Sequence, residues 1–181
     1  MTSAGDRTTD APSGRDRVLA AALRLFSRKG FDRVTTDQIA RESGVSQAYA
    51  VRAFGGKTGL IRFLCQNAAA HVEALFRVMA PAPSSPASRQ EFREQFQTFA
   101  FESDEMRLLA QLFACGADPE LGPLARDGFL RVSRLLHDDL GMSLSETRRI
   151  LATGMLAATL AALDYPQPAD SVIQYLIDGS E

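Results

Sequence analysis

With 181 residues and 45% hydrophobic side chains, the chain is long enough and apolar enough to bury a core, which excludes general disorder. The net charge is only −2, but it is unevenly distributed: residues 1–80 contain 12 basic and 7 acidic side chains, and residues 81–181 contain 8 and 15. A basic N-terminal part joined to an acidic remainder is typical of a protein that presents one end to phosphates. Chance asymmetry of a solvated surface is the alternative interpretation.

The start of the chain and its cysteines bear on where the protein works. Residues 1–14 are polar and rich in Thr, Asp and Gly, so they are expected to form a disordered tail without a secretory signal. The longest apolar run, Ile150 to Leu163, is shorter than the roughly 20 residues that span a bilayer. Cys65 and Cys115 have neither metal-ligand spacing nor the spacing of a disulfide framework. These features predict a cytoplasmic protein with no membrane partner, no metal and no cofactor.

Three short helices are predicted in the basic N-terminal part. Residues 15–29 carry apolar side chains at helical spacing. Thr35 and Gln38 have the pattern of a capping box, which predicts the start of a second helix. Gly44 permits a tight turn, and Ser46 can cap a third helix. Two short helices joined in this way are the skeleton of a helix-turn-helix, in which the second helix of the pair enters the DNA major groove.

The polar side of the third helix carries side chains that can read DNA. Gln47 can make paired hydrogen bonds to adenine, and Arg52 can reach a guanine edge or a phosphate. Tyr49 can contact a thymine methyl or a phosphate, or it can pack between helices instead. Thr36 and Lys57 lie at predicted helix starts, where backbone N–H groups favour phosphate, although Lys57 can equally be a solvated lysine. The predicted DNA-binding residues are Thr35, Thr36, Ser46, Gln47, Ala48, Tyr49, Arg52 and Lys57.

The order and spacing of this segment resemble the DNA-binding domain of the TetR family of one-component transcriptional regulators, over about residues 15 to 64. The matching positions are Phe26, Gly30, Thr35, Thr36, Ile39, Ala40, Gly44, Val45, Ser46, Phe54, Lys57 and Leu60. The resemblance implies a homodimer that binds a palindromic operator in double-stranded DNA, as a repressor released by a small-molecule effector. One position departs from the family: Val51 stands where an aromatic residue, usually Tyr, contacts a phosphate. Tyr49 or Arg52 is expected to replace that contact.

The rest of the sequence predicts further helices. Apolar residues recur every three or four positions from Lys57 to Met79, which predicts one long helix, and no alternating strand pattern follows it. The predicted architecture is therefore all-α, with about nine helices. It comprises a helix-turn-helix domain at residues 15–60 and, as the resemblance implies, an effector-binding and dimerisation domain at residues 61–181.

Two features of the C-terminal domain are predicted from side-chain type. Several aromatic and methionine side chains are candidates for lining a pocket for a small apolar or amphipathic effector, or else belong to the ordinary core. These residues are Phe92, Phe96, Phe99, Met106, Phe113 and Phe129. A late helix is apolar nearly all round, which requires burial on more than one side, either by a second subunit or in the centre of a monomer. The predicted dimer residues are Gly154, Ala157, Ala158, Ala161 and Leu176.

An enzyme and a helical protein–protein interaction adaptor are the rival classes. No Gly-rich phosphate loop, paired catalytic carboxylates or nucleophile–base arrangement stands out, and two histidines offer little for acid–base chemistry. An adaptor would account for the C-terminal half but leaves the basic N-terminal segment unexplained. The sequence therefore predicts a DNA-binding regulator without catalytic residues.

Overall fold

The computed structural model describes residues 11–79, 91, 95–96, 98–163 and 170–178, and over these residues it contains helices and no strand. The predicted all-α architecture is confirmed. The N-terminal helices are α1 (Gly14–Lys29), α2 (Thr36–Ser43), α3 (Gln47–Phe54) and α4 (Lys57–Met79). The later elements are α6 (Asp104–Ala114), α7 (Leu121–Arg134), the π-helical turn η1 (Leu135–Asp139), α8 (Leu144–Leu163) and α9 (Ser171–Asp178).

Local hydrogen bonds set the boundaries of the N-terminal helices. The predicted capping box is confirmed: the Thr35 hydroxyl accepts from the Gln38 backbone N–H at 3.2 Å, and the Gln38 side chain accepts from the Thr35 N–H at 3.0 Å. Gly44 has a φ of 66°, the left-handed conformation that favours glycine, and it ends α2. Ser13 caps α1, so the ordered fold begins within the expected tail of residues 1–14, of which residues 1–10 lie outside the described residues.

One hydrophobic core extends through both halves of the chain. Phe26 and Ile39 are fully buried among the first three helices, and Leu60 on α4 is buried with them. Further along the same helix, Ala68 and Phe76 are buried among the C-terminal helices. Because α4 is continuous, the domain boundary predicted at residue 60 falls inside a helix that both halves share.

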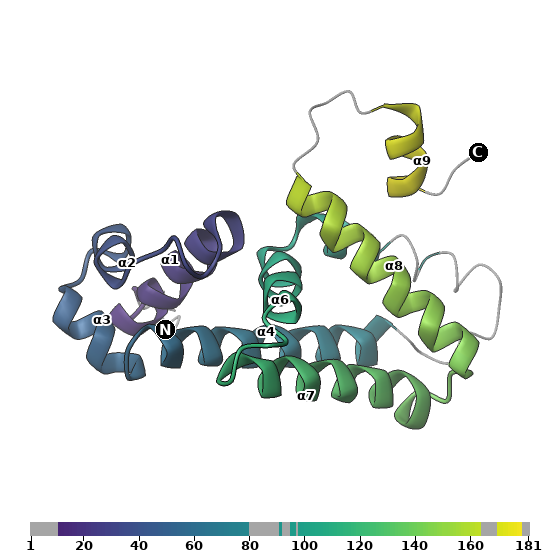
Figure 1. Cartoon of the computed structure of the whole chain (residues 1–181), viewed down its shortest axis with the longest axis horizontal. Helices are drawn as coiled ribbons and strands as arrows, with labels where there is room; N and C mark the ends of the chain where they lie inside the picture. Colours follow the sequence, from purple (N-terminus) through teal and green to yellow (C-terminus); the bar gives the residue numbers. More distant parts are fainter. Residues whose placement is uncertain (1–10, 80–90, 92–94, 97, 164–169, 179–181) are drawn as a thin grey trace, which may run out of the picture.

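Figure 1 shows α1, α2 and α3 grouped around one end of α4, with α6, α7 and α8 around the rest of it and α9 beyond α8. α6 packs against both α1 and α4, so it joins the N-terminal unit to the C-terminal helices. The described helices include none with the length and apolar character that crossing a bilayer requires.

Candidate nucleic-acid interface and internal cavity

α3 presents one side to solvent and seats the other side on the three-helix core. Ala50 is buried, and the Ser46 hydroxyl caps the helix by accepting from the Tyr49 backbone N–H at 3.2 Å. The exposed positions are Gln47, Ala48, Tyr49, Val51 and Arg52. The turn and the cap predicted from the sequence therefore leave a short helix with its polar residues free to meet a partner.

An arginine from α1 holds the far end of α3. The guanidinium of Arg15 donates to the backbone carbonyl of Ala53 at 3.3 Å. The same guanidinium lies 4.5 Å from the ring centroid of Phe54 and 4.9 Å from that of Phe63. A cation at a helix C-terminus is favourable because the last carbonyls have no partner within the helix, and the two rings add cation–π attraction. Arg15 thus fixes the orientation of α3 against α1 and α4.

A second arginine of α1, Arg17, holds the C-terminal end of α2. Arg17 donates from Nε to the carbonyl of Ser43, the last residue of α2, at 3.1 Å. Sequence reasoning missed both arginines, because their partners lie 38 and 26 residues away along the chain. The basic bias of the N-terminal part was the only sequence signal that pointed to them. The helix-turn-helix is therefore braced at the C-terminal ends of both its helices.

Tyr49 lies across the first turn of α1. A Cβ atom added at Gly14 would stand 3.2 Å from the Tyr49 hydroxyl oxygen, so the absence of a side chain at Gly14 lets the tyrosine approach. Tyr49 nevertheless keeps 39% of its surface exposed. The two interpretations offered by the sequence, a helix-packing tyrosine and a DNA-facing tyrosine, are therefore compatible.

The remaining predicted DNA contacts lie near helix starts, except Arg52, which is in the last turn of α3. The structure brings Thr36 and Gln47 together, because the Gln47 amide donates to the Thr36 hydroxyl at 3.3 Å. Lys57, at the start of α4, donates to the carbonyl of Asp32 at 3.5 Å. The side chain of Arg52 is exposed and has no hydrogen bond or ion pair within the described part of the chain. Thr35 is exposed and serves as the α2 cap.

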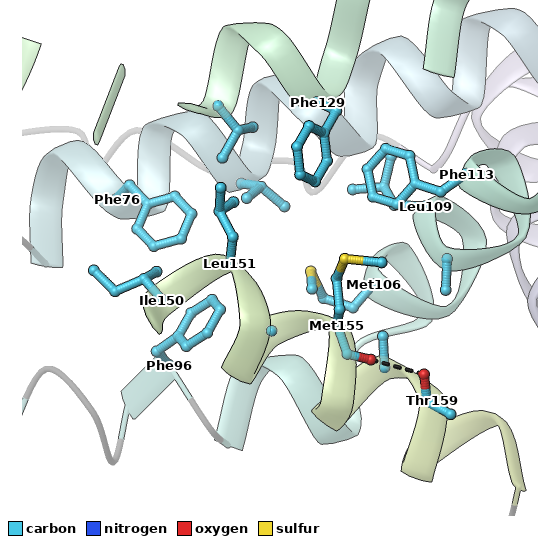
Figure 2. A pocket seen from close by; sticks show the side chains of 15 residues that line it. Phe76, Phe96, Met106, Leu109, Phe113, Phe129, Ile150, Leu151, Met155 and Thr159 are labelled. Carbon is cyan, nitrogen blue, oxygen red and sulfur yellow. Dashed lines mark hydrogen bonds between the residues drawn. The ribbon is translucent and has the colours of Figure 1, made fainter. Parts of the chain in front are cut away.

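A cavity of about 140 Å³, partly open to the surface, lies among the C-terminal helices. Figure 2 shows aromatic, aliphatic and methionine side chains converging on it from several helices. Its lining comprises Val72, Phe76, Phe96, Met106, Leu109, Ala110, Phe113, Phe129, Val132, Ile150, Leu151, Gly154, Met155, Ala158 and Thr159. No charged side chain is among them, and the Thr159 hydroxyl donates to the Met155 carbonyl at 2.8 Å. The cavity is suited to an apolar molecule.

Four of the residues predicted for an effector pocket line this cavity, namely Phe96, Met106, Phe113 and Phe129. Phe92 lies outside the described residues. Phe99 does not line this cavity: its ring packs against the imidazole of His71 with centroids 5.9 Å apart, and it borders a small neighbouring hollow with Phe76 and Phe96. Sequence reasoning missed the contributions of α4 and α8, since their lining residues look like ordinary core.

His71 also joins α4 to α6 through a carboxylate. Its Nδ1 lies 3.4 Å from Oε1 of Glu105. Burial by itself raises the pKa of Glu105, but hydrogen bonds from Ser103 and the backbone, together with His71, outweigh burial and hold that pKa below its ordinary value. Glu105 is therefore a carboxylate at neutral pH, and His71 is an inter-helix contact.

The predicted dimer residues on α8 require a correction. Gly154, Ala157 and Ala158 are buried within the chain itself. A Cβ added at Gly154 would lie 2.9 Å from Cζ of Phe96, so the small residues allow close approach to the chain's own core. Ala161 is half-buried, and Leu176 on α9 is exposed. The large exposed apolar side chains of these two helices are Leu144, Met155, Leu156, Leu163, Val172, Tyr175 and Leu176.

A three-helix unit whose last helix is capped, braced and exposed is the architecture of helix-turn-helix DNA-binding proteins. Residues 18–63, which include α2, α3 and most of α1, match the family model for bacterial regulatory proteins of the tetR family. The likeness to this family therefore concerns the N-terminal domain, about a quarter of the chain. No curated protein matches the sequence.

Solved structures share the fold over nearly the whole chain. A TetR transcriptional regulator from Legionella pneumophila is 18% identical with a TM-score of 0.72, and the alignment covers 94% of this chain and 98% of that one. GusR from Salmonella enterica is 18% identical with a TM-score of 0.64, over 94% and 95% of the two chains. NalD, the secondary repressor of the MexAB-OprM multidrug efflux pump in Pseudomonas aeruginosa, is 19% identical with a TM-score of 0.56, over 92% of each. At these identities the likeness concerns the fold.

Proposed function

We propose that the chain is a sequence-specific DNA-binding repressor that acts as a homodimer in the cytoplasm and is released from a palindromic operator by a small-molecule effector. The observation that carries the proposal is the exposed, capped and braced α3, which presents polar side chains on a rigid support. Rigid presentation matters because a side chain can distinguish base pairs only when its backbone position is fixed.

Each exposed residue of the interface has a proposed role. Arg52 is unpaired among the described residues and is assigned to a base edge or a phosphate. Gln47 and Thr36 form a polar pair at the starts of α3 and α2, and the pair suits a base edge beside a phosphate. Tyr49, with 39% of its surface exposed, is assigned the phosphate contact which Val51 cannot make. Thr35, Ser46, Ala48 and Lys57 complete the proposed DNA-binding set.

The exposed apolar surface of α8 and α9 is assigned to the dimer. Leu156 and Leu163 on α8 are 40% and 57% exposed, and Val172 and Tyr175 on α9 are 63% and 45% exposed. Several large apolar side chains on neighbouring helices are the surface that a second subunit covers. A two-fold axis through this surface would place two copies of α3 on two half-sites, which makes the operator palindromic.

α6 is the proposed route from the cavity to the DNA-binding unit. One side of α6 contributes Met106 and Phe113 to the cavity wall. Another side holds the end of α1, because the Gln111 amide donates to the carbonyls of Phe26 at 2.9 Å and Ser27 at 3.0 Å. A ligand that shifts α6 therefore also shifts α1, which carries both bracing arginines. The effector then favours a form whose α3 helices no longer match the operator spacing.

A DNA-binding titration at several salt concentrations tests the proposed function. A specific regulator prefers one duplex over scrambled duplexes of the same length, and its affinity falls steeply as salt rises. A helical interaction adaptor shows neither property. Equal affinity for every duplex would reduce the protein to a nonspecific DNA binder and overturn the proposal.

A further inference from the structure

The described residues that line the cavity offer no group that could bind a charge. Among its fifteen lining residues the one side-chain hydroxyl is that of Thr159, and this hydroxyl already donates to the Met155 carbonyl. A carboxylate or ammonium placed there would lose its water without gaining a counter-ion, which costs several kcal/mol. The occupant of this cavity must therefore be uncharged where it is buried.

The size of the cavity limits the occupant further. Its volume is about 140 Å³. An apolar protein cavity of roughly 150 Å³ stays dry and holds a single benzene molecule. The cavity is therefore large enough for one six-membered ring with a small substituent, and too small for an extended chain or a fused polycycle unless the walls move.

The walls favour an aromatic ring over a saturated one. Phe113 and Phe129 meet edge to face with their centroids 5.6 Å apart, and Phe76 and Phe96 lie 5.3 Å apart. An aromatic guest can add edge-to-face contacts to such pairs. The sulfur of Met106, which Figure 2 shows beside the cavity, adds a polarisable contact to a ring edge.

The cavity also has an entrance. A wider surface hollow of about 390 Å³ shares Phe113, Phe129 and Met155 with the inner cavity. Phe129 and Met155 are 38% and 50% exposed, so the shared wall faces solvent on its outer side. The shared residues therefore place the outer hollow next to the cavity, on a side that faces solvent.

We propose that the effector is a small, neutral molecule with one aromatic ring, bound wholly within this cavity. The inference rests on the proposed function only in calling the molecule an effector, because the binding itself does not depend on DNA. Arg126, at the rim of the outer hollow, donates to the carbonyl of Gly116 at 3.0 Å. An anionic amphiphile with its charge at that arginine is the competing class of ligand, and the experiment separates the two.

Toluene and benzoate make a matched pair of probes, because both carry one ring and only benzoate is charged. Binding to the full chain is followed by the methyl resonances of ¹³C-labelled methionine, of which the chain has five. Toluene is expected to shift Met106 and Met155 and to leave Met142, which does not line the cavity, in place. Benzoate is expected to bind at least about 100-fold more weakly. Equal or tighter binding of benzoate overturns the proposal in favour of the anionic class.

Two substitutions on the same helix locate the binding. Ala110 lines the cavity, and Ala114, one turn later on α6, is exposed. Ala110→Leu fills the cavity and is expected to weaken toluene binding at least about tenfold, whereas Ala114→Leu leaves it unchanged. A far-UV circular dichroism melt checks that each variant folds, and Ala158→Val fills the same cavity from α8 should Ala110→Leu fail to fold. Toluene binding that survives cavity filling overturns the proposal.

The outcomes also separate this inference from the proposed function. Toluene binding is measured without DNA, and operator binding is measured without toluene. If the chain selects one DNA sequence but toluene shifts no methionine resonance, the proposed regulatory function stands and the proposed class of effector is refuted. If the chain binds toluene but has the same affinity for every duplex, the proposed cavity ligand stands and the proposed regulatory function is refuted.

Discussion

Removing the amide of Gln111 should loosen the junction between α6 and α1. This side chain donates to the carbonyls of Phe26 and Ser27, which lie in the last turn of α1, at 2.9 and 3.0 Å. Carbonyls at a helix C-terminus need a partner outside the helix. The Phe26 carbonyl also accepts from the Gly30 backbone N–H, whereas the Ser27 carbonyl receives its partner from Gln111 on another element. We therefore predict that Gln111→Leu, which keeps the approximate size of the side chain, destabilises the fold.

The magnitude follows from the hydrogen bonds gained and lost. Two neutral hydrogen bonds contribute about 1 kcal/mol each. The Gln111 Oε1 atom is buried and has no partner among the described residues. Removing this unsatisfied acceptor therefore raises the free energy of unfolding by about 1 kcal/mol, which offsets part of the loss. The net loss for Gln111→Leu is therefore about 1 kcal/mol, or a Tm lower by about 2–4 °C for a chain of this length. Gln111→Glu places a carboxylate against two carbonyls and should cost about 3 kcal/mol at neutral pH.

The pH dependence of Gln111→Glu gives a further check. Partial burial against two carbonyl oxygens raises the pKa of the introduced carboxyl above its unfolded value. A group whose folded pKa is raised contributes stability below the unfolded pKa and loses it as pH rises through the folded pKa. The protonated acid can donate one hydrogen bond, so the difference in stability between Gln111→Glu and the parent chain should become smaller at acidic pH.

Thermal melts at one fixed protein concentration measure these differences, because dimer formation makes Tm depend on concentration. Gln66→Leu, at an exposed position of α4, is the matched control and should stay within about 0.5 kcal/mol of the parent chain. If the Tm of Gln111→Leu equals that of this control, and the Tm of Gln111→Glu is no lower, then the Gln111 hydrogen bonds do not hold α6 to α1.

Three further predictions concern the interface and the core. Arg52→Ala should weaken binding to the preferred duplex by about 1–3 kcal/mol and relax base preference at one position, as measured by fluorescence anisotropy; an equal loss on every duplex would assign Arg52 to a phosphate. Ser46→Ala removes the α3 cap and should lower the free energy of unfolding by about 1 kcal/mol in urea, with Ser46→Asp restoring most of it; equal stability of all three chains would show that the cap is unimportant. Burial raises the pKa of Cys65 to about 12, so iodoacetamide should not modify it at pH 8 in the folded chain and should do so after denaturation; rapid labelling of Cys65 in the native protein would contradict its burial.

The parts of the fold that depend on neighbouring residues were predictable from the sequence. The capping box at Thr35 and Gln38, the turn at Gly44 and the cap at Ser46 each involve partners within a few residues. Their geometry follows from backbone sterics and orphan N–H groups, which the sequence states directly. The exposed face of α3 followed from the same signals.

Contacts between distant residues were not predictable in the same way. The partners of Arg15 and Gln111 are backbone carbonyls, which every residue possesses, so no residue type in the sequence points to them. The buried face of α8 was not predictable for a different reason. Its apolar residues occur nearly all round the helix, so periodicity cannot choose an inner face, and Gly154 was assigned to a partner subunit although it packs against Phe96.

The most direct test of the account is selection of bound fragments from a random pool of double-stranded DNA by the purified chain. A homodimer with two exposed α3 helices should enrich a palindromic motif with half-sites about one helical turn, or a multiple of it, apart. Arg52→Ala should reduce that enrichment without abolishing retention of DNA at low salt. A pool that stays random, or a motif without two-fold symmetry, would contradict the central claim that two copies of α3 read DNA together.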